Sequence, residues 1–197
     1  MSAAHTDAIH PPTSTGVNTW KLGFWVFMGS ETLFFGTLIA TFMVYKHASI
    51  VGPFPTEILN IPLTSISTFV LLMSSLAVVI GLDGVQNGKR GQALGGLMAT
   101  ILLGATFLGF QAYEFTHFYH EGLTLQTNLF GSAFFVLTGF HGAHVTLGVI
   151  WLLILWLDLV RLGVRPEHAL RVEIAGLYWH FVDIVWIVIF TLIYLIE

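Results

Sequence analysis

The sequence contains no cysteine. A chain without cysteine holds no disulfide, no thiolate-bound zinc, no iron–sulfur cluster, no copper bridged by thiolates and no covalently attached c-type haem. Charged residues are also scarce, at 9% of the chain against roughly 25% in an average soluble domain. The seven Lys and Arg residues are scattered and form no basic face, so we expect no nucleic-acid partner.

Apolar residues make up more than half of the chain. They make up 55% of the chain, and the mean hydropathy is +0.82. A helix needs about 20 apolar residues to cross the roughly 30 Å of hydrocarbon in a bilayer. Five runs meet that length, at about 20–45, 61–82, 91–117, 128–157 and 173–196. The sequence therefore predicts an all-α integral membrane protein, with a five-helix bundle over 20–197 and a polar tail over 1–19.

The basic residues predict how the bundle sits in the membrane. Six of them fall on the side of the N-terminus: Lys21, Lys89, Arg90, Arg161, Arg165 and Arg171. Lys46 alone falls on the other side. By the positive-inside rule we expect the N-terminus in the cytoplasm and the C-terminus outside. Five aromatic residues near the segment ends match the position of interfacial aromatic belts: Trp20, Trp25, Tyr45, Tyr178 and Tyr194.

Ionisable side chains inside the apolar runs are the candidates for function: Glu31, Glu114, His141, His144, His180 and Asp183. Counted along their helices, Glu31 and Asp183 lie about 15 Å deep. Such groups cost several kcal/mol in lipid, so they should face the bundle or a partner subunit. The spacing of three residues places His141 beside His144, and His180 beside Asp183, on one helix face.

Three interpretations of these side chains compete. The segments "EFTH", "HFYHE" and "HGAH" contain the ligand spacings of di-iron sites, and two facing helices with His141 or His144 and His180 could ligate a haem. Neither set of ligands shares one depth, so we favour buried histidines that hydrogen-bond helix to helix. Glu31 stays open between packing and proton traffic, because a carboxyl group at mid-membrane is often protonated, unless a histidine of another helix pairs with it.

Four segments carry a family resemblance: "WKLGFWVFMGSETLFFG", "GFQAYEF", "GSAFFVLTGFHGAHVTLGVIW" and "YWHFVDIVWIVIFTLIYL". They resemble subunit III of the haem–copper terminal oxidases, the cytochrome c oxidase subunit III family, from about Trp20 to Ile196. The resemblance identifies Glu31, Glu114 and Asp183 as the family's buried carboxyl groups, and His141, His144 and His180 as its histidines. Mitochondrial-like members have seven helices, so we expect the short five-helix bacterial form.

The resemblance implies a non-catalytic subunit of aerobic respiration that binds neither haem nor metal. Haems and copper then belong to partner subunits, and oxygen is reduced to water in subunit I. The expected partners are subunit I by direct contact, subunit II, a small subunit IV and membrane lipids, in the plasma membrane of a bacterium. We expect a proton-translocating cytochrome c oxidase; the alternatives are a quinol oxidase subunit or a nitric oxide reductase accessory protein. Small residues should let helices approach closely, within the bundle or at the interface with subunit I: Gly29, Gly36, Gly95, Gly96, Gly104 and Gly148.

Overall fold

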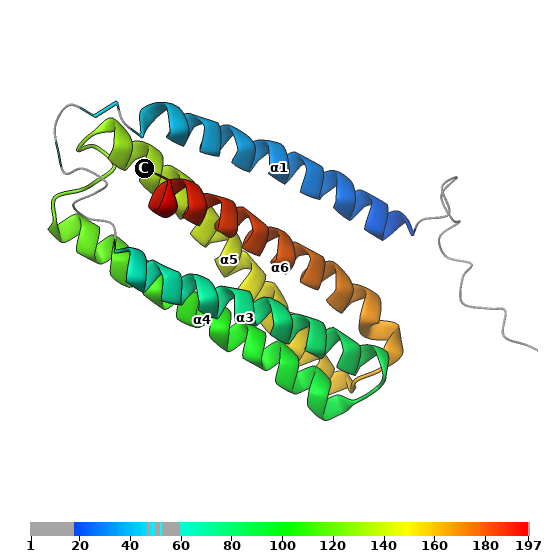
Figure 1. Cartoon of the computed structure of the whole chain (residues 1–197). Helices are drawn as coiled ribbons and strands as arrows, with labels where there is room; N and C mark the ends of the chain where they lie inside the picture. Colours follow the sequence, from blue (N-terminus) through cyan, green and yellow to red (C-terminus); the bar gives the residue numbers. More distant parts are fainter. Residues whose placement is uncertain (1–17, 47, 50–51, 53–59, 197) are drawn as a thin grey trace, which may run out of the picture.

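The computed structural model describes residues 18–46, 48–49, 52 and 60–196, which form a bundle of long helices (Figure 1). These are α1 (Thr19–Tyr45), α3 (Ile61–Gln86), α4 (Arg90–His120), α5 (Leu129–Leu162) and α6 (Ala169–Phe190). A short 3₁₀ helix, η1 (Pro166–His168), precedes α6, and a π-helical turn, η2 (Thr191–Leu195), follows it. Among the described residues, five helices are long and apolar enough to cross a membrane. The predicted fold class of an all-α membrane bundle is confirmed.

The helices extend beyond the apolar runs because hydropathy marks the hydrocarbon layer, whereas helix ends are set by capping. The side chains of Asn18, Asn60 and Asn128 each accept a hydrogen bond from a backbone N–H in the first turn of a helix. At its C-terminal end α5 stops at Gly163, whose φ of 86° suits glycine. Of the predicted tail, residues 1–17 lie outside the described residues.

Helix α6 begins earlier than its apolar run. The apolar run starts at residue 173, whereas the helix begins at Ala169, about one turn earlier. Asp183 therefore lies about 21 Å from the start of its helix, at 1.5 Å per residue. Its depth of about 15 Å, counted from the start of the apolar run, stays a prediction, and His180 meets the middle of α3.

Helix α6 lies at the centre of the bundle and α1 at its edge (Figure 1). α6 packs against α1, α3 and α5, while α1 packs mainly against α5 and α6. The buried share of the most apolar stretch is 56% in the last span and 17% in α1. α1 buries Met28, Phe35 and Phe42, whose spacing of seven residues makes one narrow stripe. Most of the surface of α1 therefore faces away from the other described helices.

Helices α3 and α4 form the closest pair, and glycine makes their contact possible. A Cβ atom at Gly96 would lie 2.5 Å from the backbone nitrogen of Gly81, and one at Gly84 would lie 2.4 Å from that of Ala93. Gly104 and Gly148 lie against the indole ring of Trp179. Close approach is thus confirmed for three of the predicted glycines, Gly96, Gly104 and Gly148.

Gly29, Gly36 and Gly95 make no such contact within the described bundle, so close approach of a partner helix at these three positions stays a prediction. No described atom comes within 4 Å of a Cβ atom built at any of them, since they lie on the outer faces of α1 and α4. The aromatic-belt interpretation fails for two tyrosines. Tyr178 and Tyr194 are buried, and their hydroxyl groups donate hydrogen bonds to acceptors inside the bundle.

Lys46, at the end opposite to the other basic residues, is also buried. Its Nζ donates to the carbonyl oxygen of Leu192 at 3.0 Å and to that of Ile196. These carbonyl groups stand at the C-terminal end of the last helix, where the helix leaves acceptors unpaired and where the dipole favours a cation. Lys46 therefore ties the end of α1 to the end of η2.

Candidate functional site

The predicted side chains occupy three levels of the bundle and do not form one cluster. Glu31 on α1 meets His144 on α5. One level further toward the C-terminal end of α6, His180 and Asp183 share a hydroxyl group of α3, and His141 bonds to the backbone of α6. Glu114 bonds to α3 and η2 near the other end of the bundle. Each of these levels joins different helices.

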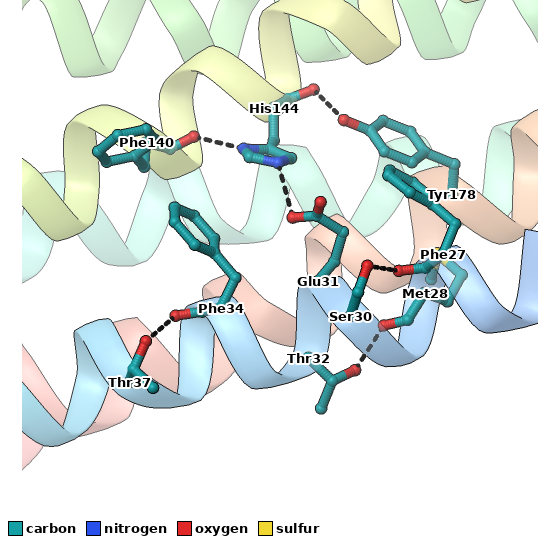
Figure 2. A network of polar contacts seen from close by, with 10 residues as sticks. All are labelled: Phe27, Met28, Ser30, Glu31, Thr32, Phe34, Thr37, Phe140, His144 and Tyr178. Carbon is teal, nitrogen blue, oxygen red and sulfur yellow. Dashed lines mark hydrogen bonds and ion pairs between the residues drawn. The ribbon is translucent and has the colours of Figure 1, made fainter.

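Glu31 and His144 form the contact drawn in Figure 2, with 3.1 Å between Oε2 of Glu31 and Nε2 of His144. Both side chains are largely buried, with 19% of Glu31 and 15% of His144 exposed. The ring of Phe35 meets the imidazole edge to face, with 4.9 Å between ring centroids. The pair thus sits in mostly apolar surroundings between α1 and α5, where a hydrogen bond is stronger than in water.

The geometry fixes the position of one imidazole proton. Nδ1 of His144 lies 2.7 Å from the carbonyl oxygen of Phe140, which can only accept, so Nδ1 carries a proton. Nε2 and Glu31 then need one further proton between them. Either Glu31 is a neutral acid that donates to Nε2, or His144 is an imidazolium that donates to a carboxylate. In both cases the pair has no net charge and shares one proton.

Other hydroxyl groups on α1 are occupied by their own helix. The side chains of Ser30, Thr32 and Thr37 donate to the carbonyl oxygens of Phe27, Met28 and Phe34, at 2.7 to 2.9 Å (Figure 2). Since each hydroxyl has one proton, these groups do not donate to Glu31. The hydroxyl of Tyr178 approaches the pair from α6 but donates to the backbone oxygen of His144, at 3.1 Å.

Ser75 of α3 joins the second level, because its hydroxyl group contacts both ionisable side chains of α6. It donates to Oδ2 of Asp183, and it lies 3.0 Å from Nδ1 of His180. As the serine proton goes to Asp183, Nδ1 of His180 must donate to the serine oxygen. The spacing of three residues had placed His180 and Asp183 on one face, and Ser75 is the group that this face meets.

His141 lies in the interior and is fully buried. Its Nε2 is 3.3 Å from the carbonyl oxygen of Val182 on α6. The imidazole packs against the ring of Trp186, with 4.7 Å between centroids, and edge-on against Phe107. Thus His141 contributes one bond between helices and a packed aromatic contact.

Glu114 forms the third level. Its Oε1 accepts from Thr64 of α3 at 2.8 Å and from Tyr194 of η2 at 2.9 Å. The side chain is buried, so these two hydroxyl groups replace the water that a carboxyl group would otherwise bind. Within the described part of the chain, no three His, Asp or Glu side chains are grouped to hold a metal ion.

Sequence reasoning missed a stripe of hydroxyl groups on the inward face of α3, of which Thr64 and Ser75 bond to the ionisable side chains. The members of the stripe recur at helical spacing: Thr64, Ser67, Thr68, Ser74 and Ser75. Trp179 and Trp186 of α6 donate their indole N–H groups to Ser74 and Thr68 at 2.8 and 2.9 Å. Hydroxyl residues that recur every three or four positions in an apolar helix are the signal that could have found this face.

Comparison with known proteins assigns the bundle to a family. A sequence model described as cytochrome c oxidase subunit III matches residues 3–197, nearly the whole chain. The chain belongs to the cytochrome c oxidase subunit III family. The family predicted from the motifs is therefore confirmed, and the protein is subunit III of a haem–copper terminal oxidase complex, in association with other oxidase subunits.

Relatives in this family carry two kinds of name. The chain is 43% identical to a probable quinol oxidase subunit 3 of Staphylococcus saprophyticus, over 91% of this chain and 90% of that protein. It is also 43% identical to two proteins of Bacillus subtilis. One is a quinol oxidase subunit 3, matched over 88% of this chain and 85% of the relative. The other is a cytochrome c oxidase subunit 3, matched over 88% and 84%.

Proposed function

We propose that this subunit III is non-catalytic, packs directly against subunit I, and supports proton uptake by that subunit during oxygen reduction. The observation that carries the proposal is the Glu31–His144 pair, which shares one proton on α1, the helix with the most outward-facing surface. A proton-sharing pair at the edge of the bundle stands near whatever covers α1. The hydrogen bonds of His141 and His180 to neighbouring helices support a structural role for the histidines.

The outer face of α1 suits the partners that we propose. It exposes large apolar side chains along the whole helix: Trp20, Trp25, Val26, Leu33 and Val44. In a membrane these side chains meet either lipid or apolar helices of another subunit. We propose subunit I as the direct neighbour, with subunit II and a small subunit IV in the same complex. Haems and copper belong to those partners, and the complex lies in the plasma membrane of a bacterium.

For the electron donor we propose cytochrome c. Quinol is the second candidate, and it is favoured by the names of the relatives in Staphylococcus saprophyticus and Bacillus subtilis. Reduced cytochrome c and a reduced quinol, offered separately to the purified complex, distinguish the two by the rate of oxygen uptake. Oxygen uptake with quinol but not with cytochrome c would contradict cytochrome c as the donor.

Removal of this subunit tests the proposed role. We expect a core of the remaining subunits to keep its haems and copper and to reduce oxygen at first, because in this proposal the electron-transfer ligands belong to the partner subunits. Activity should then fall progressively during turnover, and proton uptake should slow. Immediate and complete loss of oxygen reduction, in a core that retains every metal centre, would contradict a non-catalytic role.

A further inference from the structure

Gln111 of α4 makes a buried polar contact with α5, next to His141. Only 7% of Gln111 is exposed, and its Nε2 donates to the carbonyl oxygen of Thr138 at 2.8 Å. A Cβ atom at Gly142 would lie 2.7 Å from Oε1 of Gln111, so the amide group occupies the space that glycine leaves. Phe107, one turn earlier on α4, meets the imidazole of His141 edge-on, with 5.8 Å between ring centroids. The amide group therefore lies against the same turn of α5 that carries the imidazole.

Both side chains hold an acceptor atom that no described residue satisfies. Nε2 of His141 lies 3.3 Å from the carbonyl oxygen of Val182, which can only accept, so Nε2 carries the proton and Nδ1 is an acceptor. Oε1 of Gln111 is an acceptor as well. Both atoms are buried, and neither has a hydrogen-bond partner among the described residues. Since buried polar atoms in folded proteins are almost always paired, with protein or with ordered water, these two acceptors indicate a bound donor.

The chemistry of the two acceptors limits what the donor is. An anion would face two lone pairs, and a cation would exchange its hydration shell for two neutral ligands. The described residues also contain no group of three His, Asp or Glu side chains that could complete a metal site. A water molecule is small and uncharged and has two O–H donors, one for each acceptor.

We propose that one ordered water molecule is bound between α4 and α5, where it donates one hydrogen bond to Nδ1 of His141 and one to Oε1 of Gln111. Gln111 already bonds to the backbone of α5 through Thr138, and His141 bonds to the backbone of α6. The water completes a chain of hydrogen bonds that joins α4, α5 and α6. This site lies inside the bundle, so it goes beyond the proposed support of subunit I and does not depend on the electron donor.

Two glycines on α5 provide a matched pair of variants. Gly142→Ala places a methyl group 2.7 Å from Oε1 of Gln111, so the amide group must move away from its position. Gly139→Ala is the control, because no described atom lies within 4 Å of a Cβ atom at Gly139 on the same helix. Two further variants remove the acceptors directly. Gln111→Met removes the amide group, and His141→Phe removes Nδ1 but keeps a ring against Trp186.

The experiment uses the whole oxidase complex, purified with the native chain and with each variant. Cryo-electron microscopy, at a resolution that shows other buried waters, tests for a density at hydrogen-bond distance, about 2.7 to 3.2 Å, from both acceptors. We expect this density in the native complex and in Gly139→Ala. We expect its loss in Gly142→Ala, Gln111→Met and His141→Phe.

Thermal unfolding of the same samples gives a second measurement. Gln111→Met and His141→Phe should lower the midpoint of unfolding by less together than the sum of their separate effects, because each removes the same water. The control combines Gln111→Met with His144→Phe, whose effects should add, since His144 bonds to α1. Additive effects of Gln111→Met and His141→Phe would show that the two acceptors share no water.

The native complex alone decides the proposal if the variants do not assemble. A map that shows other buried waters but no density between Gln111 and His141 would overturn it. So would a side chain, from a partner subunit or from a part of this chain outside the described residues, that donates to the two acceptors. A density that persists in both Gly142→Ala and Gln111→Met would also contradict the bridging water, because neither variant keeps the amide group in place.

Discussion

Glu31 and His144 share a single proton across the contact between α1 and α5. His144 donates from Nδ1 to the carbonyl oxygen of Phe140 at 2.7 Å, so its Nε2 alone faces Oε2 of Glu31, at 3.1 Å. The ring therefore cannot turn its other nitrogen to Glu31 without losing a backbone bond. This relationship links α1, at the edge of the bundle, to α5, and it makes the two residues one unit in any mutational test.

The first prediction concerns their coupling. We expect Glu31→Ala and His144→Ala each to destabilise the purified complex. The double variant should lose less stability than the two single variants lose together, and the difference is a coupling energy of about 0.6 to 1.7 kcal/mol. Thermal unfolding of the four proteins measures it. The exposed pair of Arg165 and Glu167 is the control, and it should show coupling below about 1 kcal/mol. Additive effects of Glu31→Ala and His144→Ala would show that the contact carries no energy of its own.

A second prediction concerns where the shared proton lies. Separating charge in apolar surroundings is costly, so we expect the neutral form, in which Glu31 is a carboxylic acid and His144 a neutral imidazole. Infrared difference spectra should contain a protonated carboxyl band that disappears in Glu31→Gln. Glu173→Gln, which removes the partner of Lys21, should instead remove a carboxylate band. Loss of a carboxylate band in Glu31→Gln would indicate an ion pair.

Substitution of Ser75 tests the second level. Ser75→Ala leaves His180 and Asp183 without the hydroxyl group that joins them to α3, so we expect a loss of about 1–3 kcal/mol in the stability of the complex. Ser65→Ala is a matched control on the same helix, because Ser65 is exposed and bonds only to its own helix. That control should change stability by less than about 0.5 kcal/mol. Equal effects of the two substitutions would rule out a role for the shared hydroxyl.

Adjacent glycines on α4 should respond in opposite ways to alanine. A Cβ atom at Gly96 would meet the backbone of α3 at 2.5 Å, so Gly96→Ala should force the helices apart and cost about 1–3 kcal/mol. No described atom lies within 4 Å of a Cβ atom at Gly95, so Gly95→Ala should leave stability unchanged or stabilise the helix by up to about 1 kcal/mol. Thermal unfolding of both variants measures these changes in stability. A stable, fully assembled Gly96→Ala complex would contradict the close contact of α3 and α4.

Orientation in the membrane is the fifth prediction. Reporter tags on the N-terminus and between Arg161 and Arg171 should both lie in the cytoplasm, and a tag on the C-terminus should lie outside. Accessibility of each tag to a membrane-impermeant reagent, in intact cells and in permeabilised ones, checks this. A tag on the N-terminus that reacts in intact cells would reverse the assignment.

The sequence by itself determined the class of protein, the five helices and the family, because hydrophobic length and motif order are local properties of the chain. It also selected the six ionisable side chains, since their cost in lipid depends on depth along one helix. Only the tertiary structure decided which side chains these residues contact. The contact of Glu31 with His144 joins positions 113 residues apart, and that of Ser75 with Asp183 joins positions 108 apart. Which helices meet, and which face of each is turned inward, depends on packing between helices, as the contrast of Gly95 with Gly96 and the burial of Tyr178 and Tyr194 demonstrate.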